Sequence, residues 1–184
     1  RESGAPELIE TMKAEGDNSP ADVIISSDAG TLYRFKDAGL MQPVESELLA
    51  TRIPEHFRDP DNQWYGLAKR LRVIVYDPAR VEPEQVDEYA DLASANLEGD
   101  VCMRSSTNIY NLSLMGELID RLGKDTAEAW ARSVVANFAR PPQGGDTGQI
   151  EAIAAGQCSV ALVNHYYWVR MTQGSDAQRK SVEK

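Results

Sequence analysis

The residues of this chain best suited to chemistry are three tyrosines, Tyr110, Tyr166 and Tyr167. A phenolate is a hard anionic oxygen ligand, and ferric iron prefers such ligands over thiolate or thioether. Neighbouring side chains on a strand point to opposite faces, so Tyr166 and Tyr167 can reach one ion only where the backbone is irregular, such as a strand end. The pattern therefore indicates a ferric site. The alternative is one ring in the core and one at the surface.

A second polar cluster precedes Tyr110. Arg104 is followed by Ser105 and two further hydroxyl residues, directly before an expected helix. Backbone N–H groups at a helix start bind anions, and a guanidinium can clasp a carboxylate or carbonate with two hydrogen bonds. Arg104 and Ser105 are therefore predicted to bind an anion or to neutralise phenolate charge. The alternative for Arg104 is a surface cation or a structural ion pair.

Three other polar positions are interpreted as structural. His165 directly precedes the tyrosine pair, and its side chain should alternate away from the tyrosine that follows it. Asp146 or Thr147, in the turn GGDTG, is expected to cap the helix that follows, and Asp28 to cap an earlier one. The same turn lacks the Gly-Lys-Ser/Thr ending of a phosphate-binding loop.

Helical and strand patterns alternate along the chain, which favours an α/β fold. A buried strand is expected at 72–76, and another at 159–164 runs directly into the tyrosine pair. Ligands of open α/β sheets bind at the carboxyl ends of strands, so this connection suits a binding site. The remaining expected elements are helices at 6–15, 88–99, 109–122, 125–138 and 149–155, strands at 21–27 and 100–105, and a loop at 41–63.

The composition is acidic, with a formal net charge of −10 and a pI of about 4.7. Nucleic-acid binding requires clustered Lys and Arg, so this class of partner is not expected. No apolar run approaches the roughly 18–20 residues of a membrane span.

Five stretches, met in order between about residues 8 and 173, carry a family resemblance: SPADVIISSDAG, QWYGLAKRLRVIVYDP, CMRSSTNIYN, GGDTGQIEAIAAGQC and ALVNHYYWVRM. They resemble the periplasmic ferric-ion-binding proteins of bacterial iron ABC transporters. The tyrosine pair with its upstream tyrosine is the specific part of the match.

The resemblance implies an α/β fold of the periplasmic-binding-protein (Venus flytrap) type, with open mixed or parallel sheets flanked by helices. Family members begin with an extra segment and continue well past residue 184, so the chain is expected to be an internal piece, incomplete at both ends. Residues 1–76 would belong to the first lobe up to a hinge strand, and 77–173 to a second lobe that carries the tyrosines. Residues 174–184 would be a polar tail.

The resemblance also implies a function. In the family, three or four tyrosines bind one ferric ion, and Tyr110, Tyr166 and Tyr167 match those ligands. Arg104 with Ser105 matches a segment that in some members binds a synergistic anion such as carbonate. The protein is then expected to be a monomer in the periplasm that passes Fe(III) to a membrane ABC permease, and not an enzyme.

Cys102 and Cys158 each lie at a short β-like run, so both could start neighbouring strands. An oxidising periplasm would allow a disulfide between them, and the compartment implied by the resemblance favours it. The alternative is two reduced, buried cysteines.

Two other functions stay open. A related flytrap protein could bind an organic anion or a polyamine, with the tyrosines only lining its pocket. A tyrosinate-ligated iron enzyme would need histidines beside the tyrosines, and the chain holds only two histidines, neither well placed.

Overall fold

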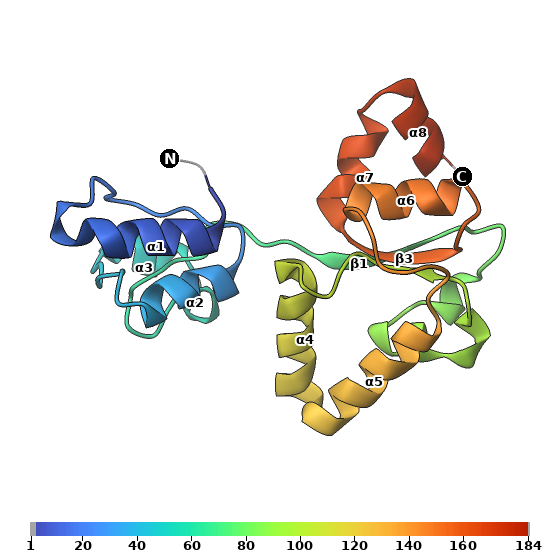
Figure 1. The fold of residues 1–184 in the computed structure, drawn as a ribbon, viewed down its shortest axis with the longest axis horizontal. Helices are drawn as coiled ribbons and strands as arrows, with labels where there is room; N and C mark the ends of the chain where they lie inside the picture. The colour runs from blue at the N-terminus through green and yellow to red at the C-terminus, as the bar shows by residue number, and fades with distance from the viewer. Residues whose placement is uncertain (1–2, 184) are drawn as a thin grey trace. The chain divides into compact units, whose positions relative to one another are not determined.

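The computed structural model describes residues 3–183, and the chain divides into two compact units, one ending at Lys69 and the other beginning at Arg70 (Figure 1). The sequence analysis assigned residues 72–76 to the first lobe and 174–184 to a tail. In the structure, strand β1 (Arg72–Tyr76) pairs within the second unit, and helix α8 (Asp176–Val182) packs against two helices of that unit. Both segments therefore belong with the second unit.

The first unit is helical. It contains α1 (Ala5–Glu15), α2 (Ala29–Asp37) and α3 (Glu47–Arg52), with 3₁₀ turns η1 (Gly16–Asn18) and η2 (Glu55–Phe57). The predicted helix at 6–15 and the predicted Asp28 cap are confirmed, since Asp28 Oδ1 accepts a hydrogen bond of 2.8 Å from the Gly30 N–H. The loop predicted at 41–63 contains α3, because Ser46 caps this helix by accepting from the Leu49 N–H.

The strand predicted at 21–27 is wrong. These residues form no strand, and Val23 and Ile25 are 77% and 87% exposed. A strand is stable only beside a hydrogen-bonded neighbour. Within the described part of the first unit, the one such contact is an isolated bridge between Arg58 and Tyr65. The β-branched residues at 21–27 therefore do not form a strand, because no neighbouring strand among the described residues pairs with them.

The second unit is built on a mixed three-stranded sheet in the order β1-β3-β2. Strand β3 (Val160–Asn164) pairs antiparallel with β1 and parallel with the two-residue strand β2 (Val101–Cys102), which is shorter than the predicted strand at 100–105. The register places Arg72 opposite Asn164. The start of β1 and the end of β3 therefore lie at the same edge of the sheet.

Strand β3 is buried on both faces. Helices α4 (Ile109–Leu122) and α5 (Lys124–Ala136) cover one face, and α6 (Asp146–Ala154), α7 (His165–Thr172) and α8 cover the other (Figure 1). Val160 and Leu162 belong to the core on the α4–α5 side, whereas Ala161 and Val163 belong to the core on the α6 side. Fully burying a side chain such as Val or Leu stabilises the fold by about 1.5–3 kcal/mol, so β3 fixes the position of every element around it.

The helices predicted at 109–122 and 125–138 are confirmed as α4 and α5. The segment 88–99 forms two 3₁₀ helices, η4 (Tyr89–Ala93) and η5 (Ala95–Leu97), in place of one predicted helix, because Ser94 between them is extended and caps the second. A further 3₁₀ turn, η3, covers Pro83–Gln85. No helix within residues 3–183 is long and apolar enough to cross a membrane.

Cys102 and Cys158 form a disulfide, with Cα atoms 5.9 Å apart. Both cysteines are fully buried, one on β2 and the other shortly before β3. The bridge closes a loop with a sequence separation of 56 that includes α4, α5 and α6.

We expect replacement of both cysteines by alanine to lower the free energy of unfolding by about 2–4 kcal/mol, because the unfolded chain regains the entropy that the closed loop removes. Chemical denaturation of the oxidised protein and of the Cys102→Ala/Cys158→Ala variant measures this difference. Equal midpoints and slopes would contradict the stabilising role of the bridge.

Candidate metal centre

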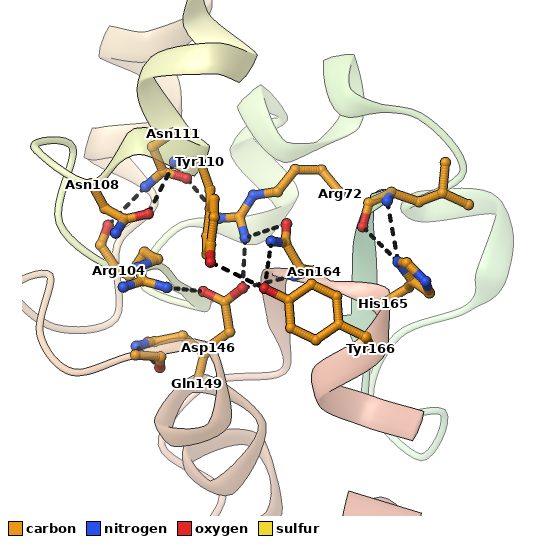
Figure 2. Close-up of polar contacts among 12 residues, drawn as sticks. Arg72, Arg104, Asn108, Tyr110, Asn111, Asp146, Gln149, Asn164, His165 and Tyr166 are labelled. Atoms are coloured by element: carbon orange, nitrogen blue, oxygen red, sulfur yellow. Dashed lines mark hydrogen bonds and ion pairs between the residues drawn. The ribbon is translucent and has the colours of Figure 1, made fainter. Parts of the chain in front are cut away.

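The candidate site lies at the edge of the sheet where β1 begins and β3 ends (Figure 2). The first turns of α4, α6 and α7 reach the same place, as does the segment that follows β2. Each element ends or begins there, so its polar side chains need not enter the apolar core.

Two of the three tyrosines meet directly. The phenolic oxygens of Tyr110 and Tyr166 lie 3.1 Å apart and share a hydrogen bond (Figure 2). Tyr110 is placed by the start of α4, where Asn108 caps the helix and accepts a hydrogen bond of 3.0 Å from the Tyr110 N–H. The Asn164 side chain donates to the Tyr166 oxygen over 3.3 Å. Two oxygens from distant parts of the chain therefore share one position.

Tyr167 lies beside them, with its ring stacked on that of Tyr166 at a centroid distance of 4.6 Å. Strand β3 ends at Asn164 and α7 begins at the next residue, so the tyrosine pair stands on the first turn of a helix. Successive side chains diverge by about 100° on a helix instead of 180° on a strand. This change from strand to helix is the irregular backbone that convergence of the two rings requires.

His165 is structural, as the sequence predicted. Its Nδ1 accepts a hydrogen bond of 3.1 Å from the Leu71 N–H, and its own backbone N–H donates to the Leu71 carbonyl over 3.0 Å. The imidazole therefore ties the start of α7 to the residue before β1.

Beside the tyrosines lies a cluster of three charges, the partly buried Arg72 and Arg104 and the fully buried Asp146 (Figure 2). Asp146 is fully buried, and its two oxygens accept from the Arg72 guanidinium at 2.8 Å and from the Arg104 guanidinium at 3.0 Å. A third hydrogen bond of 2.7 Å comes from the Asn164 N–H. The expected cap role of Asp146 is wrong, because Gly145 occupies the cap position and the carboxylate turns to the arginines.

Asparagines join this cluster to the helices. Arg72 donates to the Asn111 side-chain oxygen over 2.6 Å and to that of Asn164 over 3.3 Å. The Asn111 amide in turn donates to the Arg104 carbonyl over 3.0 Å. The Ser105 hydroxyl pairs with that of Thr107 at 2.9 Å and shapes the turn before α4. The network thus brings Arg104 to the tyrosines, whereas Ser105 joins it through its carbonyl, which accepts from the Asn111 amide over 3.2 Å.

Arg72, Asn111 and Asn164 were not among the site residues predicted from the sequence. Arg72 carried one signal, since an arginine that opens an otherwise apolar strand needs a partner when it is buried. The partner Asp146 lies 74 residues away along the chain, so sequence alone could not pair them.

Positive charge surrounds the tyrosine rings. The guanidinium carbons of Arg104 and Arg72 lie 5.1 and 5.9 Å from the Tyr110 ring centroid. Those of Arg70 and Arg170 lie 5.6 and 5.8 Å from that of Tyr166. Positive charge at this range favours the ionised form of a phenol.

The two hydrogen-bonded phenols differ in acidity. Burial raises the pKa of Tyr110, and the hydrogen bond to Tyr166 and the charges of Tyr166 and Tyr167 raise it further. Burial opposes ionisation of Tyr166 too, but hydrogen bonds from Tyr110, Asn164 and Tyr167, with the charge of Arg70, outweigh it and lower its pKa. Tyr166 is therefore the first of the pair to ionise.

The arrangement is suited to bind a hard cation through oxygen. Among residues 3–183, no group of three or more His, Cys, Asp and Glu side chains is placed to hold a metal ion. The clustered phenols are thus the donors that this part of the chain offers, and phenolate suits ferric iron.

Comparison with known proteins agrees with this chemistry. A family model described as bacterial extracellular solute-binding protein matches residues 18–178. The chain belongs to this family of bacterial extracellular solute-binding proteins.

Curated relatives of this chain are named for iron. Iron uptake protein A1 of Synechocystis sp. is 45% identical over 181 residues, which cover 98% of this chain and 50% of the relative. The Fe(3+)-binding periplasmic protein of Serratia marcescens is 28% identical over 168 residues, which cover 91% of this chain and 48% of the relative. The chain therefore spans about half the length of the curated relatives it matches.

The fold agrees as well. A solved structure of FutA from Trichodesmium, in complex with iron and citrate, superposes with a TM-score of 0.94 at 44% identity. The matched region covers 99% of this chain and 58% of the FutA chain. The predicted α/β solute-binding-protein fold and the resemblance to ferric-binding proteins are confirmed.

We expect Tyr110→Phe to raise the pKa of Tyr166, because the variant loses a hydrogen bond that stabilises the Tyr166 phenolate. Ultraviolet absorbance during a titration of the iron-free protein reports phenol ionisation. The matched control is Tyr33→Phe, which removes an exposed phenol of the first unit and should leave the pKa of Tyr166 unchanged. If the pKa of Tyr166 is the same in Tyr110→Phe as in the wild type, the two phenols are not coupled.

Proposed function

We propose that this protein binds ferric iron through the phenolates of Tyr110, Tyr166 and Tyr167 and delivers it to a membrane ABC permease. The observation that carries the proposal is the 3.1 Å contact between the Tyr110 and Tyr166 oxygens, beside the stacked ring of Tyr167. Two phenols that share a hydrogen bond already place two donor atoms near one point. Both phenols release their protons to solvent when their oxygens bind a cation that lies between them.

The surrounding charges explain how neutral phenols become ligands. An unperturbed phenol has a pKa of about 10, so each ligand must lose a proton for iron to bind near neutral pH. The charge of the ion provides most of that driving force. Four arginines lie within 6 Å of the tyrosine rings. The charge of Arg70 helps to lower the pKa of Tyr166, whereas burial and the neighbouring tyrosines raise the pKa of Tyr110. Arg104 would then act by neutralising phenolate charge.

The relatives support the same reading. Relatives of this chain are named for iron uptake and for Fe(3+) binding, and the FutA structure holds iron and citrate. We therefore propose a periplasmic location, a monomeric state and a role limited to binding, with no covalent chemistry.

Ferric loading of single Tyr→Phe variants tests the proposal. We expect wild-type protein to develop a broad visible band on loading, because phenolate-to-iron charge transfer absorbs there. Tyr166→Phe and Tyr167→Phe should each weaken ferric affinity at least about 100-fold while thermal stability changes little, since each variant loses one donor oxygen and keeps its ring.

The matched control is Tyr33→Phe, whose lost hydroxyl lies in the first unit and far along the chain from the site. Its band and affinity should equal those of the wild type. Wild-type absorbance and affinity in both Tyr166→Phe and Tyr167→Phe would show that these phenolates are not ligands.

A further inference from the structure

Asn111 is the buried residue that follows Tyr110 on the first turn of α4 (Figure 2). Its side-chain oxygen accepts a hydrogen bond of 2.6 Å from the Arg72 guanidinium. Its amide nitrogen donates to two backbone carbonyls, that of Arg104 over 3.0 Å and that of Ser105 over 3.2 Å. One side chain thus contacts both of the arginines that lie within 6 Å of the Tyr110 ring centroid.

These hydrogen bonds match the chemistry of an amide side chain. Asparagine has two N–H donors and one carbonyl oxygen, and here the nitrogen meets two carbonyls while the oxygen meets a cation. A carboxylate at this position would set an oxygen against the two carbonyls. An apolar side chain of similar size would leave the guanidinium and both carbonyls without this partner, which is costly for buried groups. An amide therefore suits position 111 better than either.

The same bonds fasten the turn that leads into Tyr110. The chain between β2 and α4 is irregular, and the Asn108 N–H closes a turn by donating to the Ser105 carbonyl over 3.2 Å. Asn108 then caps α4 and accepts from the Tyr110 N–H. The Asn111 side chain reaches back from the helix to the start of this turn. Both ends of the turn are therefore fixed to each other, with Tyr110 between them and Asn111.

We propose that Asn111 is a positioning residue for the phenolic oxygen of Tyr110. It holds the backbone of Arg104 and the guanidinium of Arg72 beside the Tyr110 ring, and so fixes where the Tyr110 oxygen meets that of Tyr166. The consequence for iron rests on the proposed ferric function: affinity depends on Asn111 although its side chain is not a ligand. The hold on the turn does not depend on iron.

Hydrogen exchange of the iron-free protein tests the hold on the turn. We expect Asn111→Ala to speed amide exchange at Thr107, Asn108 and Tyr110 about 10-fold, because their hydrogen bonds lie in a turn that has lost its anchor. Exchange at these three residues equal to that of the wild type would overturn the proposal.

The matched control is Asn137→Ala in the same unit. Asn137 is similarly buried, and its amide also donates to two backbone carbonyls, those of Leu92 at 2.9 Å and Ser94 at 2.7 Å. This variant should lose stability as Asn111→Ala does, but should leave exchange at residues 107–110 unchanged.

Ferric affinity, measured by competition with nitrilotriacetate, separates positioning from stability. Asn111→Ala should bind iron about 10–100-fold more weakly than the wild type, with its visible band shifted, because the Tyr110 oxygen no longer lies in place. Asn137→Ala should keep the wild-type affinity and band. A purely structural role for Asn111 predicts two variants that bind iron alike, and that result would overturn the proposal.

A double variant shows whether Asn111 acts through Tyr110. When Tyr110→Phe has already removed the oxygen, adding Asn111→Ala should weaken ferric affinity by less than about 3-fold, because residues that act as a unit are not additive. Losses that multiply in the double variant would show that Asn111 acts elsewhere.

Asn111→Asp has the same shape and keeps the experiment decisive if Asn111→Ala does not fold. Its carboxylate retains an acceptor for Arg72 and loses both donors to the turn, so exchange at residues 107–110 should again be faster. Wild-type exchange there would overturn the proposal. If wild type forms no iron band in any buffer, the ferric function fails, and exchange in the iron-free protein alone decides the role of Asn111.

Discussion

The fully buried carboxylate of Asp146 holds together segments that the chain order keeps far apart. Arg72 opens β1, Arg104 follows β2, and Asp146 opens α6, so the two ion pairs join three elements at one edge of the sheet. Buried charges cost several kcal/mol each to remove from water, and loss of one partner typically costs about 3–5 kcal/mol. Loss of one of these partners would leave another charge unpaired, and both guanidiniums lie within 6 Å of the Tyr110 ring centroid.

The apolar part of the fold makes such a cluster possible. Strand β3 is buried on both faces and ends at Asn164, whose backbone binds Asp146 and whose side chain contacts both Arg72 and Tyr166. The chain then turns into α7, which places two adjacent tyrosines on one side. The disulfide between Cys102 and Cys158 joins β2 to the segment before β3 and thus closes the loop that carries the rest of the site.

Local patterns in the sequence predicted much of this structure. The strands at 72–76 and 159–164 and the two long helices depend on residues close in the chain, whereas Tyr110 lies 56 residues from Tyr166. The strand predicted at 21–27 is absent because a strand also needs a hydrogen-bonded neighbour, which composition does not reveal. Asp146 was misread for a related reason: a helix-start aspartate normally caps its own helix, and only the fold shows that two distant arginines compete for it.

A crystal structure of the ferric-loaded protein tests the central claim most directly. The account predicts iron bonded to the phenolic oxygens of Tyr110, Tyr166 and Tyr167, with both arginines still paired to Asp146. Iron bound elsewhere, or Tyr110 and Tyr166 still hydrogen-bonded to each other beside the bound metal, would contradict it.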